Sequence, residues 1–216
     1  TVTELVENAG AMREEELKSF TVAARAAAEE AEAVVLTGSL PQGAPAGIFA
    51  ELLAGFPCPA VLDIRGAELQ AALPHRPLLV KPNREELGRT IGQDLAGADE
   101  EQLFAAMSEL NAAGAQWVAI SQGGGAVLIC GASLPETTLQ RFRCIPPSVA
   151  ELVNPIGCGD SLAAGIALAV SRGATVPEAV RTGVAAAVVN LGSLAPAVLD
   201  PQQVTRGEQS ALLERI

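Results

Sequence analysis

Apolar residues along this chain fall into short continuous runs and into longer stretches where they recur every three or four positions. A short apolar run that ends at glycine, proline or a charged residue is typical of a buried strand, and the longer spacing is typical of a helix. These patterns predict strands at residues 33–37, 60–63, 78–81, 117–121, 126–130 and 139–145. They predict helices at residues 12–32, 46–54, 67–73, 84–91, 100–113, 160–170 and 177–191.

The alternation of strands and helices predicts the fold class. Strands separated by helices of this length favour an α/β protein with a mostly parallel sheet and helices on both faces. The three strands that follow Trp117 are separated only by turns, so we expect them to extend the sheet as an antiparallel edge. The helices at 160–170 and 177–191 are apolar on nearly every side and are expected to be buried. Without an internal repeat or a low-complexity linker, residues 1–216 are predicted to form a single domain.

Composition and charge narrow the class of protein. A chain of 216 residues that is 49% hydrophobic and 18% charged can bury a core, which excludes intrinsic disorder. The net charge of −11 argues against binding to nucleic acid or to an anionic membrane. No apolar run reaches the roughly 20 residues that cross a bilayer, and no secretory signal precedes the first helix. We therefore expect a cytoplasmic protein without nucleic-acid or membrane partners.

Cysteine and histidine usage excludes two kinds of chemistry. The four cysteines lack CxxC spacing and the chain has one histidine, which argues against structural zinc and against a Ser-His-Asp triad. Isolated cysteines of this kind are expected to be reduced thiols. His75, next to Pro74, is expected to be a surface loop residue.

The segment 154–160, Asn-Pro-Ile-Gly-Cys-Gly-Asp, leads directly into the buried helix at 160–170. Two glycines let successive N–H groups point at one place, and the helix N-terminus adds about half a positive charge there. Asp160 could accept a proton from a hydroxyl group next to such an anion hole. A glycine turn before an ordinary helix start is the simpler interpretation of this segment alone.

The segment 81–86, Lys-Pro-Asn-Arg-Glu-Glu, lies where a predicted strand ends and a helix begins. Asn83 and Glu86 are three residues apart, so both side chains can face one hydrated Mg²⁺. An N-cap with an acidic first turn explains these two residues equally well, but it does not explain Lys81. A lysine at the end of an apolar strand needs a partner, and a nucleotide phosphate would serve.

Two further segments follow predicted strands. Residues 37–43 contain a Gly-Ser pair that offers N–H groups and a hydroxyl to an oxyanion, although such loops are also common turns. Residues 121–126, Ser-Gln-Gly-Gly-Gly-Ala, would let a base or a phosphate lie against the backbone, and a hairpin turn is the alternative.

Taken together, five motifs in this order resemble the ribokinase-like sugar kinases, in particular the phosphofructokinase-B branch. The motifs are GSLP-x-G at 38–43, D-x-x-G at 63–66, KPN-x-E-E at 81–86, S-x-G…GA at 121–126 and N-P-I-G-x-G-D at 154–160. The resemblance implies a ribokinase-like three-layer sandwich. Lys81 and the Asn154-Pro155 pair are similar to the branch that phosphorylates sugar phosphates, and residues 3–20 look like the segment before its long helix.

The resemblance also implies roles for the residues of the last motif. Asp160 would be the base that takes the proton from the sugar hydroxyl. Backbone N–H groups of Gly157, Cys158 and Gly159 would stabilise charge on the transferring γ-phosphoryl group. Phosphoryl transfer depends mainly on positioning and electrostatic stabilisation, which agrees with this allocation.

The same resemblance implies ATP and Mg²⁺ as cofactors. Residues that would contact the phosphates or border the nucleotide are Lys81, Ser121, Gly123, Gly125 and Asn190. Residues that would organise Mg²⁺ and its waters are Asn83 and Glu86. Residues that would hold the phosphate already on the sugar are Gly38 and Ser39.

Three features differ from the family pattern. The glycine loop at 121–126 is one residue short, and Cys158 stands where alanine is usual. The N-terminal portion that supplies the lid sheet and most sugar contacts has no counterpart, so the chain is expected to be the C-terminal core without the lid sheet. Because the lid forms the dimer contact in many relatives, a homodimer is expected for the full-length protein, whereas this chain would be monomeric or would pair through strand edges.

The leading hypothesis is an ATP-dependent kinase that phosphorylates a hydroxyl of a fructose or tagatose monophosphate. One alternative is a non-catalytic nucleotide-binding module, which the shortened loop and the missing portion favour. The other is a kinase of an unphosphorylated sugar or a nucleoside.

Overall fold

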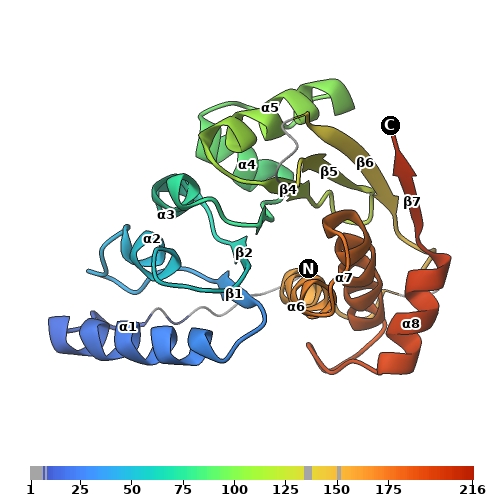
Figure 1. Ribbon diagram of the computed structural model, residues 1–216. Helices are drawn as coiled ribbons and strands as arrows, with labels where there is room; N and C mark the ends of the chain where they lie inside the picture. Colours follow the sequence, from blue (N-terminus) through green and yellow to red (C-terminus); the bar gives the residue numbers. More distant parts are fainter. Residues whose placement is uncertain (1–6, 8, 134–137, 150–151) are drawn as a thin grey trace.

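The computed structural model describes residue 7 and residues 9–133, 138–149 and 152–216. In these residues the strands form one seven-stranded sheet, and each strand pairs with the next one in sequence (Figure 1). The strands are β1 (Val34–Thr37), β2 (Ala60–Asp63), β3 (Leu79–Val80), β4 (Trp117–Ile120), β5 (Val127–Gly131), β6 (Gln140–Ile145) and β7 (Leu212–Arg215).

The helices have the following bounds. They are α1 (Glu14–Glu29), α2 (Ile48–Leu53), α3 (Gly66–Ala72), the 3-10 helix η1 (Leu73–His75), α4 (Arg84–Ile91), α5 (Glu100–Ala113), α6 (Cys158–Ser171), α7 (Val176–Leu191) and α8 (Pro201–Ser210). The bounds of α4 and α5 agree with the prediction because local signals set them. Each begins with a capping box, at Asn83 and at Asp99, and each is followed by a glycine.

The sheet has the expected mixed topology. Strands β1 to β4 are parallel, and β4 to β7 are antiparallel. Strand β3 is short because Pro82 has no N–H to continue the ladder, although the N–H of Lys81 still donates to Leu62 O (2.8 Å).

The topology dictates which helices cover which face. Parallel strands that pair in sequence order and connect by right-handed crossovers place all their connecting helices on one side. Alternate strand residues accordingly join two cores. Leu62 and Val118 pack with α2, α3, α4 and α5, whereas Val61 and Trp117 pack with α6 and α7. Figure 1 shows α1–α5 and α6–α8 on opposite sides of the sheet, so the three-layer arrangement is confirmed.

Helices α6 and α7 approach each other through two glycines. A Cβ atom built on Gly183 would lie 2.5 Å from Leu162 O, and one built on Gly165 would lie 2.8 Å from Gly183 Cα. No side chain fits between backbones this close. This contact therefore sets the position of α6 over the sheet, and with it the position of the residues at the N-terminus of α6.

Three elements, η1, α8 and β7, were not predicted. Helix α8 contributes no buried residue, and β7 pairs with β6 although its sequence, Leu-Leu-Glu-Arg, has no continuous apolar run. Long-range pairing, not local pattern, makes this segment a strand. Helix α1 is shorter than predicted, and of its apolar residues Leu17 and Ala24 pack against the first core while Phe20 is 46% exposed.

His75 is at the surface and the cysteines are unpaired, as expected. His75 is exposed at the end of η1, and all four cysteines are free thiols. Among the described residues, none of the helices has the length and apolar character needed to span a membrane.

Gly183→Ala should lower the free energy of unfolding by about 1 kcal/mol in urea denaturation. Overpacking a close contact costs roughly 1–3 kcal/mol, and the higher helix propensity of alanine, about 1 kcal/mol, offsets only part of it. Gly97→Ala is the matched control, because a Cβ there meets nothing within 4 Å. Equal stability of the two variants would contradict the proposed role of this contact.

Candidate active site

The five motifs converge at the carboxyl-terminal edge of the parallel strands. Thr37 at the end of β1 is in register with Asp63 at the end of β2, and an isolated bridge joins Asn83, after β3, to Ser121, after β4. Helix α6 brings Gly159 to the same edge from the opposite face of the sheet. Ligands of open α/β sheets bind at such an edge.

A buried ion pair lies at the centre of this edge. Lys81 Nζ is 3.0 Å from Asp63 Oδ1, and the two side chains are only 5% and 17% exposed. Burial raises the pKa of Asp63, Lys81 opposes that shift, and the negative charges of Glu86 and Asp160 add to it. The charge of Lys81 therefore favours the ionised form of Asp63.

The N-terminus of α6 covers this ion pair. Gly157 is the N-cap, with φ of +79°, a conformation that glycine adopts without strain. A Cβ on Gly159 would lie 3.7 Å from Asp63 Oδ2 and 3.8 Å from Lys81 Nζ, so the backbone of Gly159 lies against the pair. Asp160, in the first turn, is exposed. An ammonium group and a helix N-terminus thus stand beside an exposed carboxylate.

One of the three N–H groups expected to face an anion is already used. The N–H of Cys158 donates to Pro155 O (3.3 Å), whereas its thiol is directed to α7, where it contacts Ala187 O (3.6 Å). The expectation for the Cys158 N–H is therefore not met in this structure, because the turn before α6 closes on that group. The expectation for the N–H groups of Gly157 and Gly159 stays a prediction.

Asn190 supports the loop from inside the protein. Its side chain is fully buried. Its Nδ2 donates to Ile156 O (2.8 Å) and contacts Cys158 Sγ (3.2 Å), and its Oδ1 accepts from Ala197 N (2.7 Å). With these contacts Asn190 holds the loop in place, and the expectation that the helix through Asn190 borders the nucleotide stays a prediction.

Asn83 and Glu86 form a reciprocal cap at the start of α4. Asn83 Oδ1 accepts from the Glu86 N–H, and Glu86 Oε2 accepts from the Asn83 N–H, both at 2.9 Å. Glu86 Oε1 lies 3.3 Å from Arg65 Nη1. Both the capping interpretation and the closeness of the two side chains are thus confirmed.

The same cap determines how these residues fit Mg²⁺. Carbonyl and carboxylate oxygens are the ligands that Mg²⁺ prefers, and each oxygen here keeps a lone pair beyond the hydrogen bond it already accepts. The ion usually keeps several waters, so the pair suits a hydrated Mg²⁺ held through those waters. Among the described residues no group of three or more His, Cys, Asp or Glu could hold a metal ion.

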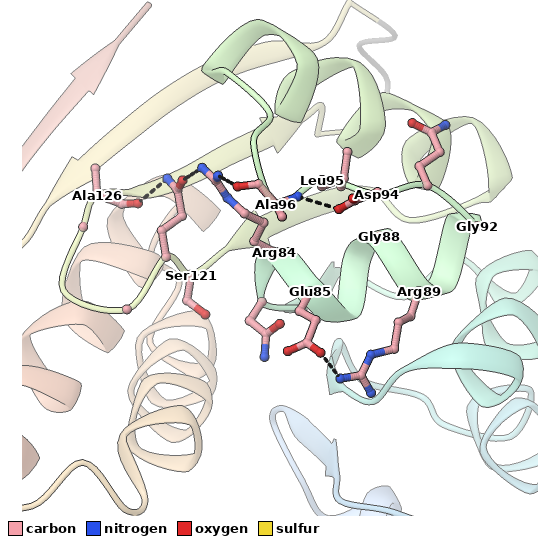
Figure 2. A pocket seen from close by; sticks show the side chains of 15 residues that line it. Arg84, Glu85, Gly88, Arg89, Gly92, Asp94, Leu95, Ala96, Ser121 and Ala126 are labelled. Carbon is pink, nitrogen blue, oxygen red and sulfur yellow. Dashed lines mark hydrogen bonds and ion pairs between the residues drawn. The ribbon is translucent and has the colours of Figure 1, made fainter.

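Two of the cavities in the structure are lined by residues of these motifs, and another lies beside the end of α7. A small one of about 180 Å³ is lined by Gly38, Ser39, Asp63 and Arg65 among others. One of about 460 Å³ is lined by Val149, Val188 and Ser193 among others. The largest, about 1050 Å³, lies between α4 and residues 121–126 (Figure 2). Ser121, Gly123 and Gly125, predicted to border a nucleotide, line this largest cavity.

Sequence reasoning missed three residues of the site. Asp63 was recognised only as a strand end, although its place after an apolar strand was a usable signal. Arg65 and Arg84 carried no signal, because their partners Glu86 and Gln122 lie 21 and 38 positions away in the sequence.

Comparison with known proteins shows what the chain is similar to. The family described as "pfkB family carbohydrate kinase" matches this chain over residues 1–201. A 1-phosphofructokinase from Rhodobacter capsulatus is 36% identical over 175 residues, which cover 79% of this chain and 52% of that protein. The chain thus spans about half the length of this curated relative.

Solved structures show the same fold. Phosphofructokinase-2 from Escherichia coli, in complex with potassium, superposes with a TM-score of 0.80 at 24% identity, over 94% of this chain and 64% of that one. A protein from Thermotoga maritima described as a possible 1-phosphofructokinase gives a TM-score of 0.81 at 17% identity, over 100% and 67%. With the family pattern matched from residue 1 to residue 201, the chain belongs to the pfkB family of carbohydrate kinases.

Proposed function

We propose that the protein containing this chain transfers the γ-phosphoryl group of ATP to a hydroxyl group of a hexose monophosphate, a fructose or tagatose phosphate. The observation that carries the proposal is the exposed carboxylate of Asp160 beside the buried ammonium of Lys81 and the N-terminus of α6. The similarity to a 1-phosphofructokinase supports the substrate class.

In this proposal the chain stabilises charge and holds a proton acceptor. Lys81, the N–H groups of Gly157 and Gly159 and the dipole of α6 offset negative charge on the phosphoryl group as it transfers. Asp160 accepts the proton of the attacking hydroxyl. Mg²⁺, when bound, neutralises phosphate charge, and Asn83 and Glu86 hold its waters.

The cavities suggest where the two substrates lie. The hydroxyl of Ser39, the backbone of Gly38 and the guanidinium of Arg65 would receive the phosphate of the sugar in the 180 Å³ cavity. The 460 Å³ cavity has valine side chains in its walls, which suits the flat faces of a nucleotide base.

The assembly and location belong to the same proposal. A homodimer of the full-length protein is proposed, and one structural neighbour is described as a tetrameric inhibited form of phosphofructokinase-2. The free thiols favour a cytoplasmic location.

Asp160→Asn in the full-length protein should lower kcat by about a thousandfold, since general-base catalysis contributes roughly 10²–10⁴-fold. Calorimetry should show affinity for Mg·ATP within twofold of the unchanged protein. Asp94→Asn, an exposed aspartate on the loop after α4, is the control and should retain full turnover.

Unchanged turnover of Asp160→Asn would contradict its role as the base. A substrate panel run beside this assay separates the alternatives. Turnover of free ribose or adenosine but not of fructose phosphates would establish the third hypothesis. Nucleotide binding without turnover of any sugar would favour the non-catalytic module.

Lys81→Met should lower the free energy of unfolding by about 3–5 kcal/mol, because it leaves Asp63 buried without its partner. Removing the cation raises the pKa of Asp63 in the folded state further above its unfolded value. Such a group takes up a proton more readily when folded, so the deficit should shrink as pH falls and grow as pH rises.

The double variant Lys81→Met, Asp63→Leu is the control for charge. It should regain most of the lost stability in urea denaturation, because apolar residues replace both charges, yet it should not regain turnover. Recovery of turnover by the double variant would show that Lys81 has only a structural role.

A further inference from the structure

Arg84 links the glycine loop to the rest of the site. It stands in the first turn of α4, where its Nη2 donates to Gln122 Oε1 (2.6 Å) and its Nη1 donates to Ala96 O (3.1 Å). Gln122 in turn donates from Nε2 to Ala126 O (2.9 Å). Figure 2 shows these dashed contacts in series along one wall of the largest cavity. We call Arg84 and Gln122, with these contacts, the strut.

The loop between the two ends of the strut has little else to hold it. Gly123, Gly124 and Gly125 are exposed, and among the described residues one backbone hydrogen bond lies inside the loop, from Gly125 N to Gln122 O (3.1 Å). Glycine loses more conformational freedom on ordering than any other residue. A run of three should therefore be ordered only when something outside the run fixes both of its ends.

The guanidinium of Arg84 donates hydrogen bonds to neutral groups. Within the part of the chain that the structure describes, no carboxylate forms an ion pair with it, and both of its acceptors are neutral. Arg89, one turn later on the same helix, is exposed and pairs with Glu85. A half-buried guanidinium that donates to a neutral amide makes a charge-assisted hydrogen bond, which is stronger than a neutral one.

The strut also separates the loop from empty space. The cavity of about 1050 Å³ is lined by Arg84 and Gln122 as well as by Gly123 and Gly125. Apart from the strut, the turn bond of Gly125 and the paired ends of β4 and β5 are the contacts that keep the glycines out of this cavity. The hydrogen bond from Gln122 Nε2 to Ala126 O joins the residues on either side of the three glycines and so fixes the distance between the two ends of the loop.

We propose that the strut is a positioning device for nucleotide binding. It holds residues 121–126 in the conformation that accepts ATP, so that the nucleotide does not have to order the loop when it binds. The inference rests on the proposed function, because it takes ATP as the ligand of this loop. Arg84 and Gln122 are positioning residues and are not assigned a contact with the nucleotide.

Calorimetry with Mg·AMP-PNP, a non-hydrolysable ATP analogue, tests this. Arg84→Met and Gln122→Met should each weaken binding about tenfold, and the double variant should be no weaker than about tenfold because both changes remove one strut. In the full-length enzyme, KM for ATP should rise about tenfold with kcat changed less than twofold. Arg89→Met, on the same helix and the same cavity, should change neither quantity.

Hydrogen exchange of the unliganded protein tests the ordering without any nucleotide. Exchange in a peptide spanning 121–127 should become faster in Arg84→Met and in Gln122→Met, and stay unchanged in Arg89→Met. Gln122→Glu keeps the acceptor for Arg84 but loses the donor to Ala126 O. Its exchange rate should therefore lie between that of the unchanged protein and that of Gln122→Met. If Arg84→Met fails to fold, Gln122→Met carries the same comparison.

The two measurements separate the two proposals. Failure of the unchanged protein to bind Mg·AMP-PNP would count against the proposed function, and exchange would still decide whether the strut orders the loop. Normal nucleotide binding with equal affinity in all variants would overturn the strut's role. Equal exchange rates would do so as well.

Discussion

The handedness of the connections between parallel strands is the constraint on which the rest of this structure depends. Strands β1 to β4 pair in sequence order, so right-handed crossovers place their helices on one face. The second face must be covered by a segment from elsewhere, and α6 and α7 provide it. Because Gly165 and Gly183 let these helices approach closely, α6 begins over the ends of the strands, where Asp63 and Lys81 meet.

The site contains positive groups although the chain as a whole is negatively charged. A net charge of −11 repels anions at long range. The local donors are the ammonium group of Lys81, whose side chain is 5% exposed, and the N-terminus of a helix. Asp63 keeps the ammonium buried, and the low dielectric around the pair strengthens its field at short range. Burial therefore makes the ion pair costly to disturb, and in the proposed function the same burial strengthens the interaction of its ammonium group with a phosphoryl group.

The sequence predicted local features well and long-range ones poorly. Helices α4 and α5 were predicted to the residue because capping boxes and terminal glycines lie within the helices' own sequence. The parallel order of the first strands and the antiparallel edge followed from loop length alone. Helix α8 and β7 were missed because they have almost no apolar face, and β7 exists only through pairing with β6.

The motifs by themselves determined the family, the edge of the sheet that carries the site, and the segments that meet there, because these depend on residue order and on strand direction. Only the tertiary structure decided which polar atoms are free. The side-chain amide of Asn190 makes three contacts inside the protein. The N–H of Cys158 donates to Pro155 O, and Arg84 donates to Gln122, which lies 38 positions later in the sequence. A hydrogen-bond partner is set by distance in space, and residue patterns along a chain do not contain that distance.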